Sequence, residues 1–323
     1  MASQIPCQEI PLAAVDLEDH TFVVSGAGDL TRLLTSMREV GLLNPPWLRA
    51  GPENRWQVVT GAKRLRAAAQ LGWETLPARP LPASAPEPHC LLVALYDNAF
   101  SRGFNLWEQA TWARRLLDHW DRTTVAARFL PYLGLPPAAA HLERLLLISA
   151  LEPPWPELCA RGRLALTAAA VLARWAAADR AAALPFLAVL PFSQSKQEQF
   201  LEDVEILARR EGVSAGDILA RPQPWQYLND PALNPPERAA AVRRLLKRWL
   251  NPRLSAALTA FQEALGRLGL RGHPRVILTP PPAFEGPDFH LEIKFRDAPE
   301  LQRLLEEIAR LTQAADFAAL TRL

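Results

Sequence analysis

The chain has 323 residues, 49% of them hydrophobic, which is enough for two or three domains with cores of their own. Its 36 Lys and Arg residues nearly balance its 34 Asp and Glu residues, so the net charge of +2 excludes a global attraction to nucleic acid, and any basic footprint must be local. Three widely spaced cysteines argue against a disulfide framework or a zinc site, and the sequence has neither a signal-peptide pattern nor a long apolar run, which predicts a soluble protein of the cytoplasm.

The first predicted elements lead to a glycine turn. An amphipathic helix from Leu33 is stopped by Gly41, and residues 56–59 predict a strand that ends at Thr60. Gly61 then opens a second helix, whose first turns carry three cations: Lys63, Arg64 and Arg66.

This corner has the features of an anion site. Gly61 lets backbone amides approach a ligand closely, and the helix start offers unpaired N–H groups and the positive end of the dipole. The sequence therefore predicts a phosphate at residues 60–66. The alternative is that Gly61 only turns the chain and the three cations face water.

The prolines indicate where the organisation changes. Residues 77–88 are rich in Pro and predict an extended loop, and the apolar run at 90–95 predicts a strand. A polar segment follows at residues 97–102, with Asp97, Asn98, Ser101 and Arg102.

The middle of the chain predicts an all-helical domain. Residues 134–136 predict the turn of a helix-turn-helix, between a helix at 124–129 and one at 138–151. The second helix offers few groups for base edges, chiefly His141 and Arg144, so we expect weakly sequence-specific DNA binding. The alternative for Arg144 is a surface ion pair or a helix docked on its neighbour.

The C-terminal part begins with a second proline cluster at 222–235, which predicts a linker. The helix after it predicts an apolar face and an opposite basic stripe that could bind DNA: Arg243, Arg244, Lys247 and Arg248. An ordinary solvated face explains the stripe equally well. A helix, two strands at 275–279 and 290–295, and a final helix complete the chain.

Three segments, in this order, resemble the N-terminal domain of the ParB family of partition proteins. They are the helix end from Gly41 to Pro45 with Asn44 at the family's Gln, the glycine-arginine box from Gly61 to Arg64, and the box at 97–101. The resemblance extends through the helix-turn-helix region.

The resemblance implies a CTP-binding fold with specific residue roles. It implies that Gly41, Asn44 and the 60–66 corner bind the nucleotide and that Asn98 holds magnesium. Asp97 takes the position linked to hydrolysis. Ser101 stands where the family has a phosphate-binding Arg, and Arg102 lies one place later. CTP binding is therefore better supported than hydrolysis, and any CTPase activity is expected to be weak.

Two relatives of the fold set the alternatives. Sulfiredoxin shares it in outline, but its catalytic Cys falls at Ala62 here, which excludes thiol chemistry. Some ParB-like domains are small-molecule kinases, but residue spacing identifies no general base for one here.

The sequence thus predicts an α+β, multidomain protein. We expect a ParB/sulfiredoxin-like α/β domain at 1–105, a helical domain with a helix-turn-helix at 106–221, the linker at 222–235, and a small α+β domain at 236–323. The expected function is CTP- and magnesium-gated DNA binding in chromosome or plasmid partition, on the nucleoid. The alternative is a scaffold for a protein partner. By resemblance we expect a homodimer. A ParA-type ATPase or another protein partner stays open, because residues 1–8 hold no Lys or Arg of the kind that stimulates such an ATPase in the family.

Overall fold

The computed structural model describes residues 6–26 and 28–321, so most of the N-terminal stretch considered for an ATPase partner lies outside the described residues. The chain divides into two compact units, Met1–Arg180 and Ala181–Leu323. The boundaries of the three expected domains stay a prediction. A mixed sheet followed by many helices and a small second sheet confirms the α+β class.

The N-terminal part of the first unit contains every strand of the larger sheet. Its elements are β1 (Gln8–Pro11), β2 (Val15–Asp16), α1 (Thr31–Val40), β3 (Trp47–Ala50), β4 (Trp56–Val58), α2 (Ala62–Gln70), β5 (Thr75–Leu81) and α3 (Glu87–Ala99). The strand order is β1-β5-β3-β4-β2, with parallel pairs β5/β3 and β4/β2 and antiparallel pairs β1/β5 and β3/β4.

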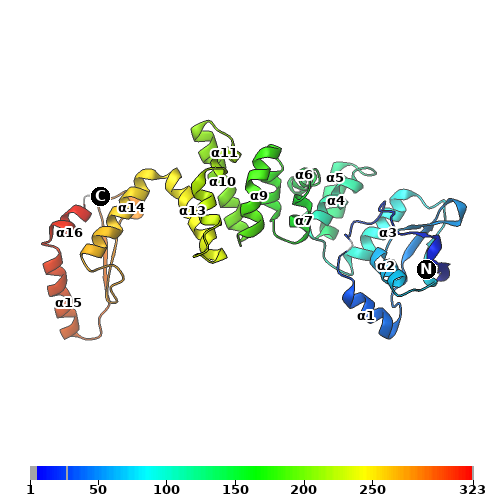
Figure 1. The fold of residues 1–323 in the computed structure, drawn as a ribbon, viewed down its shortest axis with the longest axis horizontal. Coiled ribbons are helices and arrows are strands. Elements are labelled where there is room, and N and C mark those ends of the chain that lie inside the picture. The colour runs from blue at the N-terminus through cyan, green and yellow to red at the C-terminus, as the bar shows by residue number, and fades with distance from the viewer. Residues whose placement is uncertain (1–5, 27, 322–323) are drawn as a thin grey trace. The chain divides into compact units, whose positions relative to one another are not determined.

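The core of this part lies between the sheet and two helices. Ile10, Leu48 and Leu76, from three strands, are fully buried, and Met37 of α1 and Leu65 of α2 belong to the same cluster. α1 and α2 contact each other beside the sheet (Figure 1). Burial of these side chains positions the start of α2 at the end of β4.

Two predictions in this part are wrong. The apolar run at 90–95 is not a strand but the middle of helix α3, which begins with Glu87 and Pro88 after the N-cap residue Pro86. A short apolar run fits a buried helix as well as a strand, and the first helical turn tolerates proline.

The expected loop at 77–88 begins instead as strand β5. The Arg79 N–H donates to the Pro46 carbonyl at 2.8 Å, so Pro77, two residues earlier, has its nitrogen on the same edge. There β3 starts only at Trp47, opposite Arg79. Pro77 therefore removes no hydrogen bond from the sheet.

The remaining helices of the first unit follow. They are α4 (Leu106–Leu116), α5 (Arg122–Thr124), the helical turns η3 (Val125–Phe129) and η4 (Leu130–Leu133), α6 (Ala139–Ile148), α7 (Trp155–Ala160), α8 (Leu166–Leu172) and α9 (Ala177–Val189), within which the first unit ends. Trp112, Phe129 and Leu145 are fully buried among them. Gly134, at a φ of 78°, makes the turn before α6.

The second unit contains a helical part and a small α+β part. Its elements are α10 (Gln194–Glu211), α11 (Ala215–Leu219), α12 (Pro222–Leu228), α13 (Pro235–Leu250), α14 (Pro252–Arg267), β6 (Val276–Thr279), β7 (His290–Ile293), α15 (Ala298–Leu311) and α16 (Ala315–Leu320). The antiparallel pair β6/β7 shares a core with α14 through Val276 and Phe261.

The expected linker at 222–235 is partly wrong. Residues 222–228 form helix α12, which packs on α13 and buries Pro224 and Leu228. Pro222 sits in the first turn, where its missing N–H has no partner to lose. Among the described residues, no helix is both long and apolar enough to cross a bilayer.

Candidate functional site

The glycine turn after β4 has the geometry that the sequence predicts. Gly61 adopts a φ of 79° and caps helix α2. A Cβ at this position would lie 2.7 Å from Cβ of Pro46 and 3.0 Å from Nε of Arg64. Glycine is therefore required here by both conformation and space. The N–H groups of the first three helical residues, 62–64, have no acceptor within the helix.

Thr60 fixes the turn to the sheet. It is 2% exposed, and its hydroxyl accepts a hydrogen bond from the Trp47 N–H at 3.2 Å. The N–H groups of Val59 and Thr60 both donate to the Trp47 carbonyl at 3.0 Å. The end of β4 is thus held against the start of β3, and the N-terminus of α2 opens beside it.

A cavity of about 430 Å³ lies at this helix start and gathers most of the predicted ligand residues. Its lining includes Asn44, Thr60, Gly61, Lys63, Arg64, Asp97, Asn98 and Arg102. Two predicted residues do not line it. Gly41 ends α1 at a φ of 73°, and Arg66 lies two residues beyond Arg64, on another side of α2.

Arg64 lies within the cavity wall and is held on both sides. Its Nη1 donates to the carbonyl oxygen of Asn44, and its Nη2 lies 3.2 Å from Oδ2 of Asp97. The side chain of Arg64 is 21% exposed and that of Asp97 32%. Burial lowers the pKa of the Arg64 guanidinium, and the Asp97 carboxylate opposes that effect.

Arg102 forms an ion pair with Glu108 and a hydrogen bond to Ser25, and we call these contacts the Arg102 clasp. Its Nη1 and Nη2 contact the two carboxylate oxygens of Glu108 at 2.7 and 2.9 Å, and Nη2 also donates to Ser25 Oγ at 2.6 Å. Glu108 is 4% exposed and completes the capping box of α4 with Asn105. Arg102 therefore ties the segment at Ser25 to the start of α4.

Lys63 carries the uncommitted positive charge of the cavity. Its side chain is exposed, and no carboxylate within the described residues lies in ion-pair range of it. Its Nζ lies beside Gly28, at 3.0 Å from a Cβ built there. Lys63 is therefore the cation best able to take an incoming anion without breaking a contact.

The sequence did not predict one wall of the cavity. The residues 22–25, in the segment between β2 and α1, form this wall. Arg115 of α4 helps to hold the segment, since its Nη2 donates to the carbonyls of His20 at 2.8 Å and Val23 at 3.2 Å. These contacts span more than 90 residues of sequence, and no local pattern signals them.

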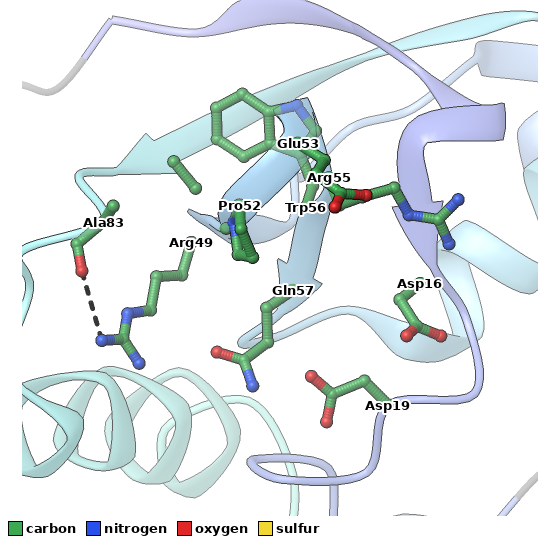
Figure 2. A pocket seen from close by; sticks show the side chains of 11 residues that line it. Asp16, Asp19, Arg49, Pro52, Glu53, Arg55, Trp56, Gln57 and Ala83 are labelled. Atoms are coloured by element: carbon green, nitrogen blue, oxygen red, sulfur yellow. Dashed lines mark hydrogen bonds between the residues drawn. The ribbon is translucent and has the colours of Figure 1, made fainter.

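A larger cavity, of about 750 Å³, lies elsewhere on the same unit. Figure 2 shows Asp16, Asp19 and Gln57 around it, with Arg49 donating to the Ala83 carbonyl at 3.2 Å. Its charges are of mixed sign, and none of the predicted site residues lines it. We therefore take the smaller cavity as the candidate site, because chemistry rather than volume distinguishes it.

The predicted DNA-binding residues of α6 are half-buried. His141 has a buried Nδ1 that finds no hydrogen-bond partner within the described part of the chain, and Arg144 is partly exposed. The neighbouring Glu143 forms an ion pair with Arg122 of α5. This pair offsets part of the repulsion that a lone Glu143 would exert on a DNA backbone.

The basic stripe of α13 is not one free face. Lys247 Nζ donates to Oδ1 of the buried Asp203 at 2.8 Å, and Arg243 Nη2 donates to Gln199 Oε1 at 2.7 Å, both acceptors lying on α10. Figure 1 shows α10 and α13 side by side. The other two cations of the stripe, Arg244 and Arg248, are exposed and take no part in these contacts. The stripe is divided because α10 packs across its edge.

Asp203 lies buried between these helices. Its side chain is 3% exposed, and its Oδ2 has no hydrogen-bond partner among the residues that the structure describes. Burial raises the pKa of the Asp203 carboxyl, and the bond from Lys247 partly opposes that effect. Removal of Lys247 would leave a buried carboxylate uncompensated.

Comparison with known proteins identifies the N-terminal domain. Residues 4–98 match the family model of the ParB N-terminal domain. The chain is 30% identical over 94 residues to a probable chromosome-partitioning protein ParB of Pseudomonas putida, covering 29% of this chain and 32% of the relative. It is 38% identical over 90 residues to a probable plasmid-partitioning protein ParB of Thermus thermophilus, covering 28% and 29%.

The match over residues 4–98 shows a ParB N-terminal domain in this chain, which confirms the resemblance found in this part of the sequence. The chain spans about a third of the length of these curated relatives, 32% and 29%. It is also similar, at 26% identity over 114 residues, to a nucleoid occlusion protein of Bacillus cereus, covering 34% of this chain and 38% of that relative.

Two solved structures of C-terminally truncated ParB from Caulobacter crescentus are also similar. The complex with CTP-gamma-S has 24% identity and a TM-score of 0.26, covering 56% of this chain and 98% of that one. The complex with the centromeric parS site has 17% identity and a TM-score of 0.34, covering 66% and 97%. These TM-scores are too low to transfer an arrangement of domains.

Proposed function

We propose that this chain is a ParB-like DNA-binding protein whose N-terminal cavity binds CTP. The observation that carries the proposal is the convergence of Asn44, Gly61, Lys63 and Arg64 on one cavity at the start of α2. Family membership of this domain points to the same role. Chromosome or plasmid partition is the process that the curated relatives favour.

The cavity offers separate regions for the parts of a nucleotide. The N–H groups of residues 62–64 and the ammonium of Lys63 suit a polyphosphate, since both present positive charge to one point. Phe22, Val24 and Leu33 supply an apolar wall for the base and ribose. Its volume of about 430 Å³ lies within the range of small-ligand sites.

Asn98 is the residue that would hold magnesium. Its Oδ1 accepts one long bond, from Arg102 Nε at 3.3 Å, and it lines the cavity. A neutral amide oxygen with phosphate oxygens and water suits Mg²⁺, which needs few protein ligands. The ion would neutralise part of the phosphate charge. The described residues hold no group of three His, Cys, Asp or Glu side chains able to bind a metal unaided.

DNA contact belongs to the helical parts. On α6, Arg144 is partly exposed, and on α13, Arg244 and Arg248 are exposed. Cations of this kind contact phosphates without reading sequence, so we expect strongly salt-dependent and weakly specific binding.

Homodimerisation is part of the same proposal. The two-stranded sheet β6/β7 leaves Ile277 and Leu291 40% and 43% exposed, and Phe295 beyond it is 51% exposed. A two-stranded sheet with apolar side chains in water is stabilised by pairing with a second copy. Analytical ultracentrifugation of the full chain tests this, and a monomer at micromolar concentration would contradict it.

Calorimetric titration of the full chain with each nucleoside triphosphate and magnesium tests the central proposal. We expect CTP to bind best and Lys63→Ala to weaken it by roughly tenfold or more. Arg66→Ala is the matched control, because it removes the same charge from the same helix outside the cavity. Equal loss in both variants, or no binding of any nucleotide, would contradict the proposal and leave the scaffold alternative.

A further inference from the structure

The side chain of Arg64 folds back across the start of its own helix. A Cβ on Gly61 would lie 3.0 Å from its Nε and 3.1 Å from its Cζ, so the guanidinium covers the glycine turn. The Asn44 carbonyl and the Asp97 carboxylate hold it there from the two other sides. Arg64 is therefore already paired with an anionic group of the protein itself, the Asp97 carboxylate.

We infer that Asp97 is an internal counter-anion that pairs with Arg64 when the cavity is empty and lowers its affinity for polyphosphate. This inference rests on the proposed function and assigns a regulating contact to the same site. The Arg64 Nη2 to Asp97 Oδ2 distance of 3.2 Å, in a pair only 21% and 32% exposed, is the geometry that carries it.

The charge balance of the cavity explains the effect. A phosphate at the start of α2 lies next to both members of the pair, so it gains from Arg64 but is repelled by Asp97. Full use of Arg64 by the ligand requires the guanidinium to leave the carboxylate. Binding therefore replaces the Asp97 carboxylate with a phosphate as the partner of Arg64. The net gain in binding free energy is smaller than Lys63 and an unpaired Arg64 would give together.

Arg102 cannot replace the positive charge that the ParB family has at the position of Ser101. Its guanidinium is bidentate on Glu108 and also bonds Ser25, so moving it would leave a carboxylate that is 5% exposed without its partner. Ser101, at the adjacent position, is neutral and donates to the carbonyls of Asp97 and Asn98. Lys63 and Arg64 are therefore the cations that decide the affinity.

This inference makes Asp97 a positioning residue that sets affinity, whereas the hydrolytic role that the resemblance implies for it stays a prediction. The two roles predict different results when Asp97 is substituted. Loss of a hydrolytic carboxylate lowers turnover and leaves binding unchanged. Loss of a competing carboxylate strengthens binding.

The test is a calorimetric titration of the full chain with CTP and, separately, with inorganic tripolyphosphate. We expect Asp97→Asn to bind both probes roughly tenfold more tightly at low salt, with a gain that shrinks as salt rises. The amide side chain of this variant still offers an oxygen to Arg64, so the variant is expected to fold, and its melting temperature checks this. Glu87→Gln, on the same helix but outside the cavity, is the matched control.

The outcomes separate this inference from the proposed function. A gain for tripolyphosphate in Asp97→Asn without CTP binding supports the inference and contradicts the CTP proposal. CTP binding that is unchanged or weaker in Asp97→Asn overturns the inference and leaves the proposal standing. An equal gain in Glu87→Gln also overturns it, because the effect would then be one of net charge alone. If neither the wild-type chain nor Asp97→Asn binds CTP or tripolyphosphate, both the inference and the proposed function are overturned.

Discussion

The glycine corner at Gly61 and the basic helix α13 looked alike in the sequence, because each gathers several cations within a few residues. In the structure they differ. The corner directs Lys63 and Arg64 to one cavity, whereas on α13 Lys247 turns to a buried acid of α10. A turn that requires glycine at a positive φ fixes the backbone and so fixes where the following side chains point. A helical stripe fixes only a face, and neighbouring helices then take some of its charges.

The largest expected effect concerns Gly61, the residue that distinguishes the glycine corner from helix α13. Gly61→Ala places a Cβ at 2.7 Å from that of Pro46 and at a φ of 79°, so we expect a loss of about 2–4 kcal/mol in the free energy of unfolding. Urea denaturation measures it. Gly72→Ala is the control, since its φ of 74° is similar but a Cβ built there meets no heavy atom of the described residues within 4 Å, its chain neighbours aside. Equal losses would show that space at Gly61 is unimportant.

The next effect tests whether α13 uses its cations for packing. Lys247→Met leaves the Asp203 carboxylate buried without its partner, which we expect to cost about 1–3 kcal/mol in urea denaturation at neutral pH. Arg244→Met, on the same helix but exposed, is expected to change little. If both variants matched the wild type, the stripe would be an ordinary solvated face after all.

The pH dependence of stability tests the same contact. Because burial raises the pKa of Asp203, the folded chain holds this proton more tightly than the unfolded chain. The stabilisation from that proton is complete below the ordinary value of 3.8 and is lost as pH rises through the raised pKa. We expect Asp203→Asn to flatten this part of the stability profile. A profile identical to wild type would contradict the assignment.

Much of this contrast could be predicted from sequence, and part could not. Gly41 ends α1 and Gly61 starts α2, each at a position where the local backbone favours glycine. The corner could therefore be predicted from the sequence. The apolar run at 90–95 is too short to show a period, so its pattern fits a strand as well as the helix that the structure shows. The wall at 22–25 and the Lys247–Asp203 contact depend on residues distant in sequence, which local patterns do not reveal.

A smaller effect concerns the clasp beside the cavity. Glu108→Gln weakens the bidentate pair with Arg102 but keeps its shape, so we expect about 1 kcal/mol lower stability and faster amide exchange at residues 22–25. Hydrogen exchange measures the second effect. Asp118→Asn removes an acid from an exposed pair at 57% exposure and is expected to leave that segment unchanged. Equal exchange in both variants would rule out the clasp.

The most direct test follows backbone amide resonances of the full chain by NMR as CTP and magnesium are added. The account predicts large, saturable shifts at residues 61–66 and at 97–98, with no comparable shifts along 243–248. Shifts confined to the α13 arginines, or none at the glycine corner while CTP binds, would contradict the claim that the start of α2 is the phosphate site.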